Sequence, residues 1–100
     1  MNIIIYGITK ERAYEKLQTI LDNLRYGDVL KVKKSKYEFE VILKDGTRYR
    51  AITASDSARG NKWQFAYIDT LIDDEVINNI VFPSFYNCEK SRLEESYLCY

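Results

Sequence analysis

The sequence predicts one small domain over residues 1–100, of α/β (or α+β) class, with a mixed sheet of about five strands and two to three helices. Three observations lead to this fold class. Apolar residues recur at helical spacing between residues 13 and 24, continuous apolar runs occur at 3–5 and 65–68, and alternating segments flank an Asp-Gly pair. The composition is globular, because 46% of the residues are hydrophobic and only 4 are Gly and 1 is Pro.

A strand and a helix are expected at the N-terminus. Asn2–Tyr6 contains three consecutive β-branched isoleucines, which is typical of a buried strand, and Gly7 ends it. Thr9 is suited to cap a helix over about residues 10–26, which Gly27 ends. The helix has an apolar stripe of Ala13, Leu17, Ile20, Leu21 and Leu24, and a polar face of Arg12, Lys16, Asp22 and Asn23.

Three further strands are expected in the middle of the chain. Val29–Lys34 is predicted to be a strand with Leu30 and Val32 on its inner side. Tyr37–Leu43 alternates apolar and polar residues, as a half-buried strand does, and the returning strand covers about Thr47–Thr53.

A central β-hairpin is predicted at Asp45-Gly46, because both residues tolerate positive φ. A two-residue turn would set Leu43 opposite Arg48 and Val41 opposite Arg50. One face of the hairpin would then mix apolar and basic side chains, as an exposed edge or a binding surface does.

The C-terminal half of the chain is predicted to contain a loop, a strand and one or two helices. Ser55 to Lys62 has the composition of a loop, and Phe65 to Ile68 is a continuous apolar run typical of a buried parallel strand. Asp73 is placed to cap a short helix that Pro83 ends. Residues 84–100 are ambiguous, and Lys90 to Tyr97 is compatible with a last helix.

The charges exclude several function classes. Lys+Arg and Asp+Glu both number 15, so a uniformly basic nucleic-acid-binding protein is not expected. The balance hides two opposed halves, because residues 1–50 carry a net charge of +4 and residues 51–100 carry −4. The chain has no His, which removes Ser-His-Asp and Cys-His nucleophile systems and the common His-containing metal sites.

The two cysteines and the N-terminal residues indicate in which cellular compartment the protein is found. Cys88 and Cys99 are expected to be free thiols in a reducing cytosol, with a bridge that closes a short C-terminal loop as the alternative. The apolar run Ile3–Ile5 is too short for a signal peptide or a membrane span, and Met1 is compatible with a complete chain. We expect a cytoplasmic protein with no membrane partner, no cofactor and no metal.

Basic and aromatic residues gather around the predicted hairpin and form the first candidate site. Such interleaving could bind single-stranded nucleic acid by charge and base stacking, although Glu38 and Glu40 interrupt it. An ordinary charged sheet surface is the alternative. The candidate binding residues are Lys31, Lys33, Lys34, Lys36, Tyr37, Arg48, Tyr49, Arg50 and Arg59.

Acidic residues form the second candidate site, with Asp69, Asp73, Asp74 and Glu75 as its members. Asp69 follows a buried strand, where P-loop ATPases hold Mg²⁺, but many strands end in an Asp that only caps a turn. The group could bind a divalent cation or imitate phosphates toward a basic partner, whereas helix capping alone explains Asp73 and Asp74.

Five segments occur in sequence over roughly residues 3–86: Ile4–Lys10, Ile42–Thr47, Ser57-Ala58-Arg59-Gly60, Phe65–Asp69 and Ile80–Pro83. Their order resembles the ATPase domain of phage terminase large subunits. The resemblance implies a strand and helix that follow Walker A, an Arg-Gly loop ahead of the Walker B strand, and Asp69 at the end of that strand.

The departures from that family concern the catalytic parts. No G-x-x-x-x-G-K-[ST] segment is present, and Thr70 stands where the family places its catalytic glutamate. We therefore expect no ATP hydrolysis by this chain alone.

The leading functional hypothesis is a small non-catalytic phage or prophage accessory protein that binds a host or phage protein. Analogy with such proteins suggests an inhibitor of a host defence nuclease, and the 9 Tyr and 1 Trp suit a recognition surface. The alternative is a nucleic-acid- or nucleotide-binding fragment related to a DNA-packaging ATPase, whose binding would weaken steeply with salt. A Mg²⁺-dependent nuclease is a third class, disfavoured because three of its four acids are adjacent in sequence.

Overall fold

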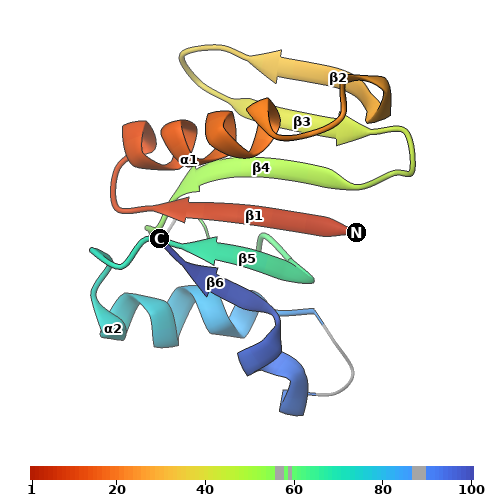
Figure 1. Cartoon of the computed structure of the whole chain (residues 1–100). Coiled ribbons are helices and arrows are strands. Elements are labelled where there is room, and N and C mark those ends of the chain that lie inside the picture. Colours follow the sequence, from red (N-terminus) through yellow and green to blue (C-terminus); the bar gives the residue numbers. More distant parts are fainter. Residues whose placement is uncertain (56–57, 59, 87–89) are drawn as a thin grey trace.

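β1 (Asn2–Gly7) lies inside a six-stranded mixed sheet, parallel to both of its neighbours (Figure 1). The computed structural model describes residues 1–55, 58, 60–86 and 90–100. In this part of the chain the strand order is β2-β3-β4-β1-β5-β6, with β2 (Val29–Lys34), β3 (Phe39–Leu43), β4 (Arg48–Thr53), β5 (Phe65–Ile68) and β6 (Tyr97–Cys99). The predicted fold class and mixed sheet are confirmed, with six strands where about five were expected.

The two halves of the sheet differ in strand direction. β3 is antiparallel to β2 and β4, whereas β4, β1, β5 and β6 all run parallel to one another. Parallel strands need long connections, which the helical segments after β1 and β5 provide. β5 is an internal strand, as its continuous apolar run predicts.

α1 (Lys10–Asp22) starts as the sequence predicts and ends earlier. Thr9 Oγ1 accepts a hydrogen bond from the backbone N–H of Arg12 at 3.2 Å, so the predicted N-cap is confirmed. The backbone N–H groups of Asn23 and Leu24 donate to residues three positions back, which tightens and closes the helix before Gly27. A short 3₁₀ helix, η1 (Tyr26–Asp28), then leads into β2.

The predicted helix near residue 80 is present but irregular. α2 (Asp74–Val76) continues into a π-helical segment, η3 (Ile77–Val81), and a 3₁₀ turn, η4 (Phe82–Ser84). Pro83 lies within the final turn, where its missing N–H prevents a regular α-helical bond. Asp73 occupies the N-cap position without a side-chain capping bond.

The sheet separates two hydrophobic cores, and β1 contributes to both of them. Ile3 and Ile5 face α1 and pack with Leu17 and Val41, among others. Ile4 and Tyr6 face the other way, toward the segment 74–84, which Figure 1 shows on the opposite side of the sheet from α1. Trp63 is fully buried in this second core, and its indole Nε1–H donates to the carbonyl of Val81 at 2.9 Å.

The register of the central hairpin differs by one residue from the prediction. The turn has three residues, because Leu43 N–H bonds the carbonyl of Thr47 and Gly46 adopts a φ of 92°. Val41 therefore pairs with Tyr49 rather than with Arg50. A shift of one residue changes which side chains share a face, so the expected pairs of Leu43 with Arg48 and of Val41 with Arg50 were wrong, and Ile42 instead lies beside Arg48.

Two further expectations were wrong at the edges of the sheet. Leu30 and Val32 are exposed, because β2 is an edge strand with an irregular register between Val29 and Lys31. The chain from Lys90 to Tyr97 is not one helix: η5 (Lys90–Glu95) is a 3₁₀ helix, and β6 follows because β5 offers it a free edge. Cys99 is an exposed free thiol, while Cys88 lies outside the described residues.

Gly7 is required by the close approach of α1 to the end of β1. A Cβ atom at this position would lie 2.6 Å from the backbone N and 2.9 Å from the Cβ of Ala13, and still closer to the carbonyl oxygen of Thr9. At Gly27 the same atom would meet nothing within 4 Å. Backbone atoms cannot move aside as a flexible side chain can, so the strand-to-helix turn depends on glycine.

We predict that Gly7→Ala lowers the free energy of unfolding by about 1–3 kcal/mol or more, because the new methyl group overlaps the first turn of α1. Gly27→Ala is the matched control and should change this free energy by less than about 0.5 kcal/mol. Urea unfolding followed by circular dichroism measures both. Equal stability of the two variants would contradict the close approach.

Candidate functional site

The most distinctive surface is the part of the sheet that no described helix covers. Cross-strand partners share a face, so the register places six residues on one side, opposite α1. We call this surface the open basic face; it consists of Lys31 and Lys33 on β2, Glu40 and Ile42 on β3, and Arg48 and Arg50 on β4. It therefore carries four cations and a single carboxylate.

Glu40 is the electrostatic centre of the open basic face. It lies between Lys33 and Arg50 in the strand register and is only 8% exposed. Arg48 Nη2 donates to Glu40 Oε1 at 2.7 Å, and Arg50 Nε lies 3.6 Å from Glu40 Oε2. The two arginine side chains remain about half exposed, at 50% and 48%. One mostly buried carboxylate thus forms ion pairs with two accessible guanidinium groups and a hydrogen bond with one of them.

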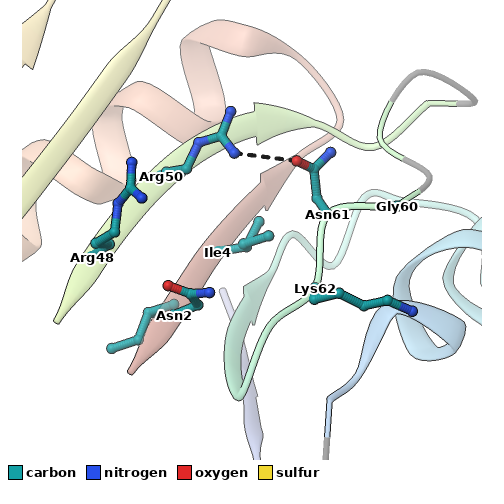
Figure 2. Close-up of a pocket in the computed structure, with 8 residues that line it drawn as sticks. Asn2, Ile4, Arg48, Arg50, Gly60, Asn61 and Lys62 are labelled. Carbon is teal, nitrogen blue, oxygen red and sulfur yellow. Dashed lines mark hydrogen bonds between the residues drawn. The ribbon is translucent and has the colours of Figure 1, made fainter. Parts of the chain in front are cut away.

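A hollow of about 220 Å³ lies beside these arginines, between β1, β4 and the chain before β5 (Figure 2). Buried Ile4 lies beneath it, and Lys62 extends away from the other side chains. Arg50 points across to Asn61, where its Nη1 donates to Asn61 Oδ1 at 3.2 Å. Asn61 is fixed in turn, because its amide donates to the carbonyl of Ala58 at 2.9 Å.

The other predicted binding residues do not share this face. Lys34 and Tyr49 lie on the α1 side, where Lys34 Nζ donates to Gln18 Oε1 at 2.7 Å. Burial raises the pKa of Tyr49 on that side. Lys36 and Tyr37 belong to the connection between β2 and β3. Arg59, with Ser57 of the predicted Arg-Gly loop, lies outside the described residues.

This separation bears on nucleic-acid binding. Of the six residues on the open basic face none is aromatic, whereas Phe39 and Tyr49 pack in the core beneath α1. The expected interleaving of charge and rings on one surface is therefore absent from this part of the sheet. Base stacking on the open basic face would need aromatic rings on that face, whereas Phe39 and Tyr49 point toward α1.

Asp69 is a buried structural carboxylate. Arg12 donates to both of its oxygens, from Nη2 to Oδ1 at 2.8 Å and from Nε to Oδ2 at 3.0 Å. The backbone N–H groups of Ile8 and Leu71 donate to it as well, at 3.1 and 3.0 Å. The hydrogen bonds from Arg12, followed by those of the backbone, lower the pKa of Asp69 to about 2.

The predicted acidic residues do not converge on one point. Asp69 faces Arg12 inside the protein, whereas Asp73, Asp74 and Glu75 are exposed at the start of α2. Among the described residues no group of three or more His, Cys, Asp or Glu side chains is arranged to hold a metal ion. Asp69 is therefore accounted for by its bonds to α1 and to two loops.

Sequence reasoning missed three residues of this region. Glu40 was treated as an interruption of the basic cluster, Asn61 as loop, and Arg12 as part of a solvated helix face. The period of two along β3 and β4, combined with the correct turn length, would have placed Glu40 opposite Arg50 and on the same face as Arg48. The pairing of Arg12 with Asp69 follows from the parallel neighbours β1 and β5, whose carboxyl ends meet at the same edge of the sheet.

No family model, no curated protein and no solved structure matches this chain. Within the described residues, no helix has the length and apolar character needed to cross a lipid bilayer. The open basic face and the hollow beside it are therefore the features that indicate a function for this chain.

We predict that Asp69→Asn lowers the free energy of unfolding by about 1–3 kcal/mol at pH 7, because a charged, buried acceptor of four hydrogen bonds is lost. The folded-state pKa lies below the ordinary value of 3.8, so this contribution is complete above about pH 5 and is lost as the pH falls toward 2. Urea unfolding from pH 2 to 7 measures it.

Asp73→Asn is the control for this prediction, because Asp73 is exposed and makes no capping bond. It should change stability by less than about 0.5 kcal/mol and preserve the acid-dependent loss. If Asp69→Asn kept the same loss between pH 4 and pH 2 as the unsubstituted protein, another carboxyl group would be responsible.

Proposed function

We propose that this chain is a non-catalytic binding module whose open basic face docks an acidic surface of a partner protein. The observation that carries the proposal is an uncovered sheet surface with four cations around one mostly buried carboxylate. Sheet side chains are held by the backbone ladder, so such a surface presents its charges in a fixed pattern. Arginine at its centre suits planar, bidentate recognition of carboxylates.

Electrostatics supports a protein partner over a nucleic acid. A continuous phosphate backbone would have to pass Glu40, which lies in the middle of the cations. The C-terminal half of the chain carries a net charge of −4 and would repel a long polyanion. A partner protein with one acidic patch can contact the basic N-terminal half of the chain alone. The opposite net charges of the two halves then orient this partner during docking.

A non-catalytic role agrees with the environment of Asp69. In the position that resembles Walker B, this carboxylate already accepts bonds from Arg12 and two backbone N–H groups. These contacts support the expectation that the chain does not hydrolyse ATP by itself.

The identity of the partner as a host defence nuclease stays a prediction, and the charges restrict how such a nuclease could bind. The DNA-binding cleft of a nuclease is basic, so it does not complement the open basic face. A nuclease would instead have to present an acidic surface outside that cleft, or meet the exposed acids Asp73, Asp74 and Glu75.

We predict that Lys31→Gln/Lys33→Gln weakens partner binding about tenfold, because it removes half of the cations of the open basic face. Lys34→Gln/Lys36→Gln is the matched control: it removes the same charge from the same region but leaves that face intact. Affinity capture from a bacterial lysate, followed by titration of the captured protein against each variant, measures the difference.

Two outcomes would contradict the proposal. Equal weakening by both double variants would indicate an effect of net charge alone. Tight binding of a 20-nucleotide dT oligonucleotide, steeply dependent on salt and lost in Lys31→Gln/Lys33→Gln, would make nucleic acid the ligand of this face.

A further inference from the structure

We infer that the hollow between Arg48, Arg50 and Asn61 is an anchoring pocket for a single carboxylate, the side chain of an Asp or Glu on the acidic partner. The inference rests on the proposed function and makes it specific, because it assigns one chemical group of the partner to one place on the open basic face. It follows from the local charge balance, the free donors, the fixed positions of the arginines and the size of the hollow.

The charge balance at the hollow leaves room for one anion. Arg48 and Arg50 share the single carboxylate of Glu40, at 2.7 and 3.6 Å. Lys62 also lines the hollow, but its side chain extends away from the arginines (Figure 2), so two guanidinium groups and one carboxylate leave one positive charge uncompensated beside Arg48 and Arg50. A second monoanionic carboxylate neutralises it, whereas a phosphate dianion would add an excess negative charge beside Glu40.

Both arginines retain donors for such a group. A guanidinium has five N–H donors, and only Nη2 of Arg48 is within hydrogen-bond distance of Glu40. Arg50 Nη1 donates to Asn61, and its Nε lies too far from Glu40 for a hydrogen bond. The bonds with the described residues therefore leave most of the N–H donors of the two forks for a ligand.

The positions of the donors are set before a ligand arrives. Glu40, itself 8% exposed, holds Arg48 from β3. Asn61 holds Arg50 from the opposite side of the hollow, and the carbonyl of Ala58 holds Asn61 (Figure 2). A preorganised pair of guanidinium groups loses less conformational entropy on binding than free surface arginines do.

The size and base of the hollow suit a side chain better than a nucleotide. Its volume of about 220 Å³ is below the roughly 300–1,000 Å³ of typical small-molecule pockets. Ile4, which is 3% exposed, gives it an apolar base against which the methylene groups of an Asp or Glu can pack.

Nuclear magnetic resonance of the arginine Nε–H groups of the unsubstituted protein provides the first test. The probe is a hexaglutamate peptide, acetylated at the N-terminus and amidated at the C-terminus, with inorganic phosphate as a separate arm. We expect the peptide to shift the Nε–H signals of Arg48 and Arg50, and to leave that of exposed Arg25 unchanged. Equal shifts at Arg25, or saturation by phosphate but not by the peptide, would overturn the assignment.

Substitution at constant charge provides the second test. Arg48→Lys/Arg50→Lys keeps the field of the open basic face but removes the planar forks, and it should weaken hexaglutamate binding about tenfold. Arg25→Lys, the matched control, should leave the affinity unchanged, and thermal unfolding checks that both variants fold.

The outcomes separate the two proposals. If hexaglutamate binds, and Lys31→Gln/Lys33→Gln weakens it while Arg48→Lys/Arg50→Lys does not, the anchoring pocket is refuted and the docking face stands. If the unsubstituted protein does not bind hexaglutamate, the docking of acidic surfaces is refuted as well.

Discussion

The structure depends on the burial of β1 from both sides. Consecutive isoleucines put apolar side chains on alternate faces, so this strand needs a packing partner above and below the sheet. α1 packs against one face of the strand and the segment 74–84 packs against the other, on opposite sides of the sheet (Figure 1). Gly7 lets α1 begin directly beside the strand that it covers. The parallel neighbours β4 and β5 complete the arrangement around β1.

The candidate site forms because α1 packs against more of the sheet than the segment 74–84 does. The side chains that pack beneath α1 come from β1, β3, β4 and β5, whereas those that meet the segment 74–84 come mainly from β1, β5 and β6. The second face of β2, β3 and the first half of β4 therefore stays in contact with solvent. Charged side chains occupy it for that reason, and Glu40 limits their mutual repulsion by bonding Arg48.

Asp69 shows that an aspartate at the end of a strand can have either a catalytic or a structural role. A carboxylate at the carboxyl end of an internal parallel strand suits metal chemistry when its oxygens face an open crevice. Here Arg12 covers both oxygens, and the ring of Tyr100 lies 5.8 Å from that guanidinium. The carboxylate consequently ties β5 to α1 and to the loops after β1 and β5. The chain position alone does not distinguish these two uses.

The sequence by itself determined the elements that depend on near neighbours. The strand Val29–Lys34, the strand Phe65–Ile68 and the Thr9 cap follow from local periodicity and hydrogen bonding, and all are present. Tertiary structure decided what depends on distant partners. β6 forms only against the edge of β5, and Arg12 meets Asp69 across 57 positions. The open basic face depended on one residue of hairpin register, because in a strand a single step exchanges the buried side for the solvent side.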